Sequence, residues 1–306
     1  MKQNMRKKAL LPAISMVLAA IIALSGVTYA WFTTGNTASV TGLDVNIQTA
    51  NGIQVSLDAS AWRSIITAKD IQDSITRVGG TYSGSANQYP TTEIAPVSSA
   101  GNVVDGKLQM FYGEIAKDGT LLSKAEAEEE RVSAGNFIAF DLFFKSSSTQ
   151  MLTLNIGDSL SFVKGASING SNDQAGAEKA VRVAFVPLGS ATTPEAARAL
   201  KDGSTALIWE PNADSRAAGV EADTGKLPYN GFNTEFESKT EAQLLDDGVV
   251  SHVTTFTGTT DIVELQAGIN KVRVYIWLEG QDVDCVNQIS FGDFTANLSF
   301  SVPEVE

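Results

Sequence analysis

The sequence predicts an all-β protein that folds as an antiparallel β-sandwich with long loops and a few short helices. Segments in which apolar and polar residues alternate with period two are spread over the whole chain, and this is the pattern of half-buried strands. Helical patterns are few and short. The chain has 306 residues, 43% of them hydrophobic and 19% charged, which is a composition that supports a packed core.

The first two strands are predicted on either side of a tight turn. Leu43, Val45 and Ile47 alternate with polar residues, and a second alternating run follows at 53–57. The dipeptide at 51–52 is Asn-Gly, which favours a hairpin because both residues tolerate positive φ. The sequence therefore predicts a β-hairpin at this point.

Further strands are predicted along the rest of the chain. The run 137–144 is apolar on nearly both faces, which indicates a central strand. The run 294–302 has the cleanest alternation in the sequence. Because the best strands lie at both ends and in the middle, a single elaborated domain over residues 31–306 is favoured. The other predicted strands are 107–113, 151–156, 181–186, 205–209 and 272–279.

Helical patterns are confined to three short segments. One begins at Thr67, one lies within 121–131, and one begins at Pro194, whose fixed φ suits a first helical turn. Two segments, 79–106 and 211–248, are rich in small and polar residues and lack periodicity. These two segments are expected to be long surface loops.

The N-terminus indicates the compartment. The first eight residues form a basic region with the four cations Lys2, Arg6, Lys7 and Lys8, and nineteen uncharged, mostly apolar residues follow them. Small residues at Thr28 and Ala30 fit a signal peptidase site with cleavage before Trp31, so residues 1–30 are predicted to be a signal peptide. The alternative is an uncleaved anchor, because about 20 apolar residues can span a bilayer. Either way the rest of the chain is expected outside the cytoplasm, as a secreted or cell-surface protein, with membrane contact only through its N-terminal segment.

The acidity of the chain disfavours two classes of partner, nucleic acid and anionic lipid. Its formal net charge is −13, and the segment before Trp31 contains cations but no acid, so the remainder is more acidic still. Such a chain is repelled by nucleic acid and by anionic lipid. Its single cysteine, Cys285, cannot form an intrachain disulfide.

The sequence contains no catalytic constellation, and we expect no enzymatic activity and no cofactor. His252 is the only histidine, and it accompanies neither an HExxH zinc motif nor a GxSxG nucleophile elbow. Cys285 lies among acids that would raise its pKa and weaken it as a nucleophile. Glu279, Asp282 and Asp284 are weak candidates for a metal site, but they lack EF-hand spacing, and a solvated loop is the favoured interpretation.

One segment carries a resemblance to a known family. Residues 26–47, GVTYAWFTTGNTASVTGLDVNI, combine a small-x-Ala cleavage site with an aromatic pair, then Thr, Ser and Asn residues, then an alternating strand. This segment resembles the start of proteins that are cut by the SipW-type signal peptidase of Gram-positive bacteria. These proteins are the TasA-like and camelysin-like proteins of the cell surface and of the biofilm matrix.

The resemblance implies a jelly-roll-like sandwich, secretion, and self-association into surface or matrix fibres. In this family the freed N-terminal segment can pair as a strand with the next subunit. Here the donor would be residues 31–47, with Leu43, Val45 and Ile47 as its apolar side chains; the alternative is that they form the first strand of their own domain. Camelysins have been classed as proteases, but this sequence shows no zinc site, so that activity is not carried over.

The alternative function is that of a monomeric, surface-displayed binding or adhesion module for glycans or host proteins. Exposed aromatic side chains would serve such a module by stacking on sugars. The aromatic residues considered for this role are Tyr82, Tyr89, Trp209 and Tyr229.

Overall fold

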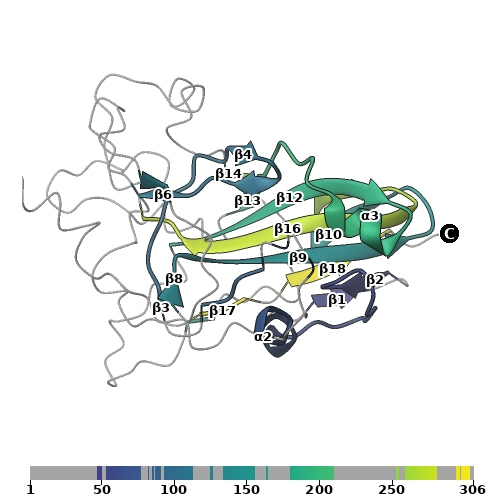
Figure 1. Cartoon of the computed structure of the whole chain (residues 1–306), viewed down its shortest axis with the longest axis horizontal. Coiled ribbons are helices and arrows are strands. Elements are labelled where there is room, and N and C mark those ends of the chain that lie inside the picture. Colours follow the sequence, from purple (N-terminus) through teal and green to yellow (C-terminus); the bar gives the residue numbers. More distant parts are fainter. Residues whose placement is uncertain are drawn as a thin grey trace, which may run out of the picture. The chain divides into compact units, whose positions relative to one another are not determined.

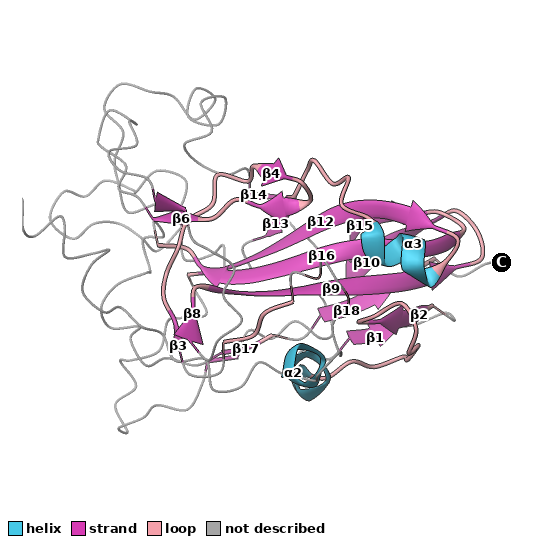
Figure 2. Ribbon diagram, viewed as in Figure 1, coloured by secondary structure: helices cyan, strands magenta, loops and turns pink. Residues whose placement is uncertain are grey.

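The structure is a computed structural model that describes fourteen segments of the chain. Contacts divide the chain into two units, Met1–Asn36 and Thr37–Glu306, and every described residue lies in the second. Within the described residues the architecture is mostly β, with antiparallel sheets, two short helices and no closed barrel (Figures 1 and 2). The described residues are 47–49, 53–76, 82, 85, 87–90, 93–112, 125–126, 134–155, 163–164, 180–209, 253–254, 259–280, 294–296 and 298–303.

The larger sheet has the strand order β14-β13-β12-β16-β9-β2. Its long central strands run antiparallel to their neighbours, whereas β14 joins β13 in parallel. The central strands are β9 (Phe137–Ser146), β12 (Val181–Ala191) and β16 (Gly268–Leu278). The flanking strands are β2 (Gln54–Ser56), β13 (Leu207–Trp209) and β14 (Val253–Thr254).

The smaller sheet has the order β1-β18-β10-β15. Three of these strands are antiparallel, but β1 pairs with β18 in parallel, with Ile47 opposite Leu298. The strands are β1 (Ile47–Thr49), β10 (Gln150–Asn155), β15 (Thr259–Leu265) and β18 (Leu298–Ser301).

Short elements complete the described fold. Thr193 caps the second helix, because its hydroxyl oxygen accepts a hydrogen bond from the Ala196 N–H at 3.3 Å. The helices are α2 (Ala68–Thr76) and α3 (Pro194–Ala199). The short strand pairs are β3 (Glu93–Ile94) with β8 (Ala134–Gly135), β4 (Val103–Val104) with β5 (Lys107–Leu108), β6 (Phe111–Tyr112) with β7 (Ala125–Glu126), and β11 (Val163–Lys164) with β17 (Phe294–Thr295).

The two sheets contact each other through aromatic side chains. The ring of Phe300 on β18 lies 5.3 Å from the ring of Phe144 on β9 and 5.9 Å from that of Phe185 on β12. These edge-to-face contacts join the two sheets and contribute beyond the apolar area they bury. Contact with the smaller sheet therefore explains why one face of the run 137–144 is apolar.

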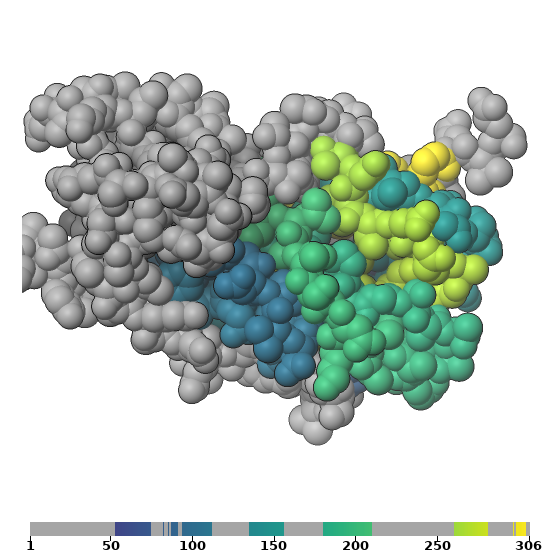
Figure 3. All heavy atoms as spheres, turned by 90° about the horizontal axis from the view of Figure 1, so that it is seen from above, coloured from purple at the N-terminus to yellow at the C-terminus, as the bar shows by residue number. Residues whose placement is uncertain are grey.

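The other face of the larger sheet is buried as well. We call residues 101–110 together with 194–201 the cover, because their apolar side chains pack on this face. Leu108 and Met110 belong to one core cluster with Phe137, Tyr275 and Trp277. Figure 3 shows the segment around residue 100, in blue, directly beside residues 180–209, in green. With both faces covered, the run 137–144 of β9 is apolar apart from one acid, Asp141.

The expectation of a surface loop at 79–106 is wrong for most of its described residues, although Asn102, Val104 and Asp105 are exposed. Tyr89, Ile94 and Val97 are all buried. The segment lacks periodicity because much of its pairing is made through isolated bridges, such as Gln88 to Ala139, which leave no alternating pattern. The segment 211–248 lies outside the described residues.

The hairpin predicted around 51–52 is also wrong. β1 and β2 lie in different sheets, so the chain crosses between sheets here. Backbone partners from other parts of the chain explain this result. β18 pairs with β1, and β9 together with Arg63 pairs with β2.

Two further predictions need correction. The helix expected within 121–131 is wrong at Ala125–Glu126, which forms a strand with β6. The run 294–302 is divided into β17 and β18, which pair with different strands, although Leu298, Phe300 and Val302 are all buried as the alternation predicts. Among the described residues, neither helix has the length and apolar character needed to cross a membrane.

Candidate functional site

The edge of the smaller sheet is the first candidate site. In the described part of the chain, β1 has one strand neighbour, β18, and its register continues from Ile47–Leu298 to Thr49–Phe300. Leu298 and Phe300 are fully buried. β1 is therefore a short strand that forms the edge of the sheet beside a well-packed neighbour.

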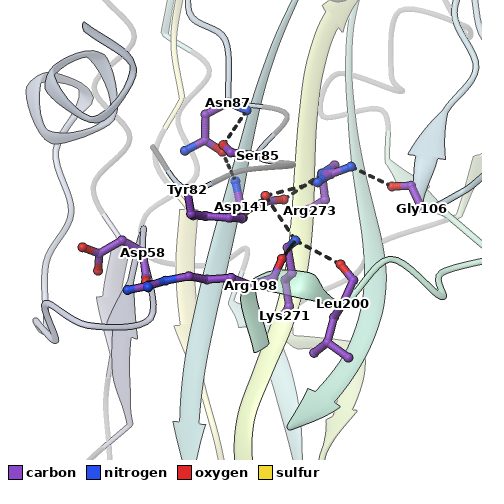
Figure 4. A network of polar contacts seen from close by, with 10 residues as sticks. All are labelled: Asp58, Tyr82, Ser85, Asn87, Gly106, Asp141, Arg198, Leu200, Lys271 and Arg273. Carbon is purple, nitrogen blue, oxygen red and sulfur yellow. Dashed lines mark hydrogen bonds and ion pairs between the residues drawn. The ribbon is translucent and has the colours of Figure 1, made fainter. Parts of the chain in front are cut away.

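The second candidate is a buried cluster of charged residues. It lies on the face of the larger sheet that the cover packs against, opposite to the face that contacts the smaller sheet. The register of β9 and β16 places Arg273 opposite Asp141 and Lys271 opposite Phe143. Arg273 binds Asp141 through Nε–Oδ1 at 2.7 Å and Nη2–Oδ2 at 3.2 Å. Lys271 Nζ lies 3.5 Å from Asp141 Oδ2 (Figure 4). The side chains of the three residues are at most 2% exposed.

The Asp141 carboxylate has a further donor beside it. Tyr82 donates its hydroxyl proton to Oδ2, and the Asp141 N–H donates to the Asn87 side-chain oxygen at 2.8 Å. Burial by itself would raise the pKa of Asp141, but the charge and hydrogen bonds of Arg273 outweigh it and lower this pKa below its ordinary value. Asp141 is therefore ionised at neutral pH. The same burial, together with the charge of Asp141, raises the pKa of Tyr82.

The two cations bind main-chain oxygens of the cover. Lys271 Nζ donates to the carbonyls of Arg198 and Leu200, each at 3.0 Å, where α3 ends. Arg273 Nη1 donates to the Gly106 carbonyl at 3.1 Å. Burial lowers the pKa of Lys271, and the charge of Asp141 only partly opposes this shift. The cluster thus contains two cations and one carboxylate, and the dipoles of the carbonyl groups stabilise the additional positive charge.

The chemistry of this cluster is that of a structural anchor. Its groups are enclosed between the sheet and the cover, and Lys271 Nζ also lies over the ring of Tyr82, at 5.1 Å from the ring centroid. All the donors described here point to protein acceptors. The arrangement fixes main-chain segments to the sheet.

A small pocket of about 70 Å³ opens beside α2, and Asp58, Arg63, Asp70 and Asp73 are among its lining residues. Protein donors already bind its acids. The Asp58 carboxylate accepts from the Ser60 hydroxyl and from backbone N–H groups, and Asp70 pairs with Arg63. Burial would raise the pKa of Asp58, but these hydrogen bonds lower it to about 2. Among the described residues, no group of three metal-ligating side chains is placed to hold an ion.

Of the residues predicted for strand exchange or for a metal site, the described part of the chain includes Ile47 and Glu279. Ile47 lies in β1, opposite Leu298. Glu279 is fully buried and accepts from the Trp277 indole N–H at 3.1 Å and the Ser99 N–H at 3.4 Å, so the expectation of a solvated loop is wrong for this residue. The predicted residues that lie outside the described part of the chain are Thr28, Ala30, Trp31, Leu43, Val45, His252, Asp282, Asp284 and Cys285.

The described aromatic residues do not form an exposed row. Tyr89 and Trp209 are buried. Tyr82 is half-buried, with its ring edge-to-face on Phe143 at 5.6 Å. Tyr229 lies outside the described residues.

Sequence reasoning missed the charge cluster, although a signal was present. Asp141 interrupts the apolar run 137–144, and Lys271 and Arg273 stand in the alternating run of β16. A charge inside a strand that is apolar on both faces needs a buried partner. The interruption at Asp141 therefore predicts a buried cationic partner, and the register of β9 and β16 identifies which residue it is.

No protein-family model matches the chain, and no curated protein or solved structure is significantly similar to it.

Proposed function

We propose that the chain is an exported structural protein of the cell surface or extracellular matrix, which self-associates into fibres by exchanging its N-terminal strand between copies. In this proposal the two sheets form a sandwich of the jelly-roll type. The observation that carries the proposal is the pairing of β1. This strand lies in parallel at a sheet edge, and the next strand in sequence, β2, belongs to the other sheet.

The physics of edge strands supports this proposal. The main-chain groups of β18 that pair with β1 can pair equally well with the same segment from a second copy. Because β1 does not form a hairpin with β2, its partner is not fixed by a local turn. A donor of one copy entering the edge of the next is a head-to-tail contact, and such contacts generate open filaments where the rotation does not close.

The N-terminal sequence supports export. The basic start, the apolar stretch and the site at Thr28 and Ala30 have the form of a signal peptide, and the segment 26–47 resembles exported matrix proteins. The strong net negative charge keeps such a chain soluble until it assembles.

The proposal is tested with protein that begins at Trp31, studied by sedimentation and negative-stain imaging. A matched variant lacks residues 31–49, which removes the donor segment together with β1. We expect polymers from the longer protein and a soluble monomer, with a cooperative thermal transition, from the shorter one. Fibres that persist without residues 31–49 would overturn strand exchange. A longer protein that stays monomeric at high concentration would favour the adhesion module instead.

A further inference from the structure

The cover rests on an apolar face of the larger sheet. Beneath it lie Phe137, Ala139, Tyr275 and Trp277, all buried. The two parts of the cover also contact each other, because a Cβ atom built on Gly106 would lie 2.7 Å from the Lys201 carbonyl oxygen. The β4–β5 turn and the segment after α3 are thus in direct contact above the sheet.

The polar attachments of the cover to the cluster all use main-chain atoms of the cover. Lys271 and Arg273 donate to the carbonyls of Gly106, Arg198 and Leu200, as described above. In addition, the Leu108 N–H donates to the Tyr275 hydroxyl oxygen at 3.2 Å. Water can replace each of these contacts without rearrangement of the β9–β16 ladder.

The segment that leads into the cover, before residue 101, is tied to the sheet more firmly. The Val97 N–H donates to the Leu278 carbonyl at 3.0 Å, and the Gly280 N–H donates to the Val97 carbonyl at 2.9 Å. These bonds continue the main-chain ladder of β16. They mark a fixed end, from which the β4–β5 turn extends over the cluster.

The cluster changes the free energy of lifting the cover. Two cations and one carboxylate are removed from water at this interface, and desolvation of ions is costly even when they are paired. When the cover lifts, Lys271 and Arg273 become hydrated again, and this hydration offsets part of the free energy of opening. A purely apolar interface has no such favourable hydration. The Arg273–Asp141 pair can remain intact, because both residues belong to the sheet.

We propose that the cover is a strap that opens as one unit from the outer face of the larger sheet while β9, β12 and β16 remain paired. The Asp141–Lys271–Arg273 cluster keeps the closed strap in register, and it makes the free energy of opening lower than it would be for a purely apolar interface at the same place. The open state exposes an apolar sheet face that includes Tyr275 and Trp277. This inference does not depend on strand exchange.

Hydrogen–deuterium exchange of the full chain, measured by mass spectrometry over a series of low urea concentrations, tests the strap. We expect peptides from 101–110 and 194–201 to exchange at least tenfold faster than peptides from β9 and β12, with a weak dependence on urea, which is the mark of local opening. If these peptides share the free energy and urea dependence of β9, the cover opens only by global unfolding and the proposal is wrong.

Variants test the role of the cluster. A triple variant, Asp141→Leu with Lys271→Met and Arg273→Met, should slow exchange of the cover about tenfold, because opening no longer hydrates buried ions. The matched control, Asp141→Asn, leaves two cations without their carboxylate and should accelerate exchange of the cover. Unchanged or faster exchange in the triple variant would overturn the role given to the cluster. If the triple variant does not fold, the urea series on the unaltered chain still decides whether the strap opens.

Discussion

Replacement of Asp141 by Asn tests the energetic importance of the buried cluster. The substitution keeps the size of the side chain but removes the only carboxylate that the described residues place against Lys271, at 3.5 Å, and Arg273, at 2.7 Å. Removal of one partner from a buried ion pair costs about 3–5 kcal/mol, because the remaining charge is buried without compensation. That loss is a large fraction of the total stability of about 5–15 kcal/mol that is typical of a domain.

The measurement is urea unfolding followed by circular dichroism and tryptophan fluorescence. The matched control is Asp73→Asn, which removes an exposed pair with Lys69 at 2.9 Å on α2. Exposed pairs of this spacing contribute about 0.3–0.5 kcal/mol, so the control should unfold almost as the unaltered protein does. If both variants lose the same small amount of stability, the cluster is not the anchor described here.

Three further predictions use the same titration. The pKa of Asp141 is lowered in the folded state, so its contribution to the free energy of unfolding is complete above about pH 4 and decreases as the pH falls below that value. Asp141→Asn should therefore weaken the loss of stability at acid pH, and an unchanged pH dependence would contradict this. Gly106→Ala should cost about 2–4 kcal/mol, because φ is +72° and the new Cβ would lie 2.7 Å from the Lys201 carbonyl oxygen; a neutral effect would show that the turn is free to move. Phe300→Ala should cost about 3–5 kcal/mol through the lost contacts between the sheets, and a loss below about 1 kcal/mol would refute that packing.

The clearest strand patterns in the sequence predicted the central strands of the larger sheet. The runs 137–144 and 181–186 lie within β9 and β12, and the run 272–279 covers the second part of β16, which extends from Gly268 to Leu278. Strands buried in the middle of a sheet need apolar side chains along their length, which is why these three were visible. The helix at Pro194 was also predicted, from the proline in its first turn, and the structure adds the hydroxyl cap of Thr193.

Long-range partners explain what the sequence did not predict. The Asn-Gly at 51–52 is a genuine local turn signal, but the strands on either side have better partners in β18 and β9. The part of the cover within 101–106 has no strand-like pattern in its sequence. Its contacts are made by the two-residue strand β4 and by a main-chain carbonyl, and neither requires alternating side chains. Asp141 was visible as an interruption, but only the register of β9 and β16 identifies Arg273 as its partner.

Disulfide trapping tests strand exchange most directly. Gln48 stands opposite Ser299 in the register of β1 and β18. In a Cys285→Ser background, one preparation carries Gln48→Cys and another Ser299→Cys, and the two are mixed, allowed to assemble and oxidised. A double variant with Gln54→Cys and Lys145→Cys, which are opposite each other in β2 and β9, serves as the intramolecular control. Strand exchange between copies predicts a disulfide-linked heterodimer from the mixture. Monomers alone from the mixture, with an intramolecular bond when Gln48→Cys and Ser299→Cys share one chain, would contradict it.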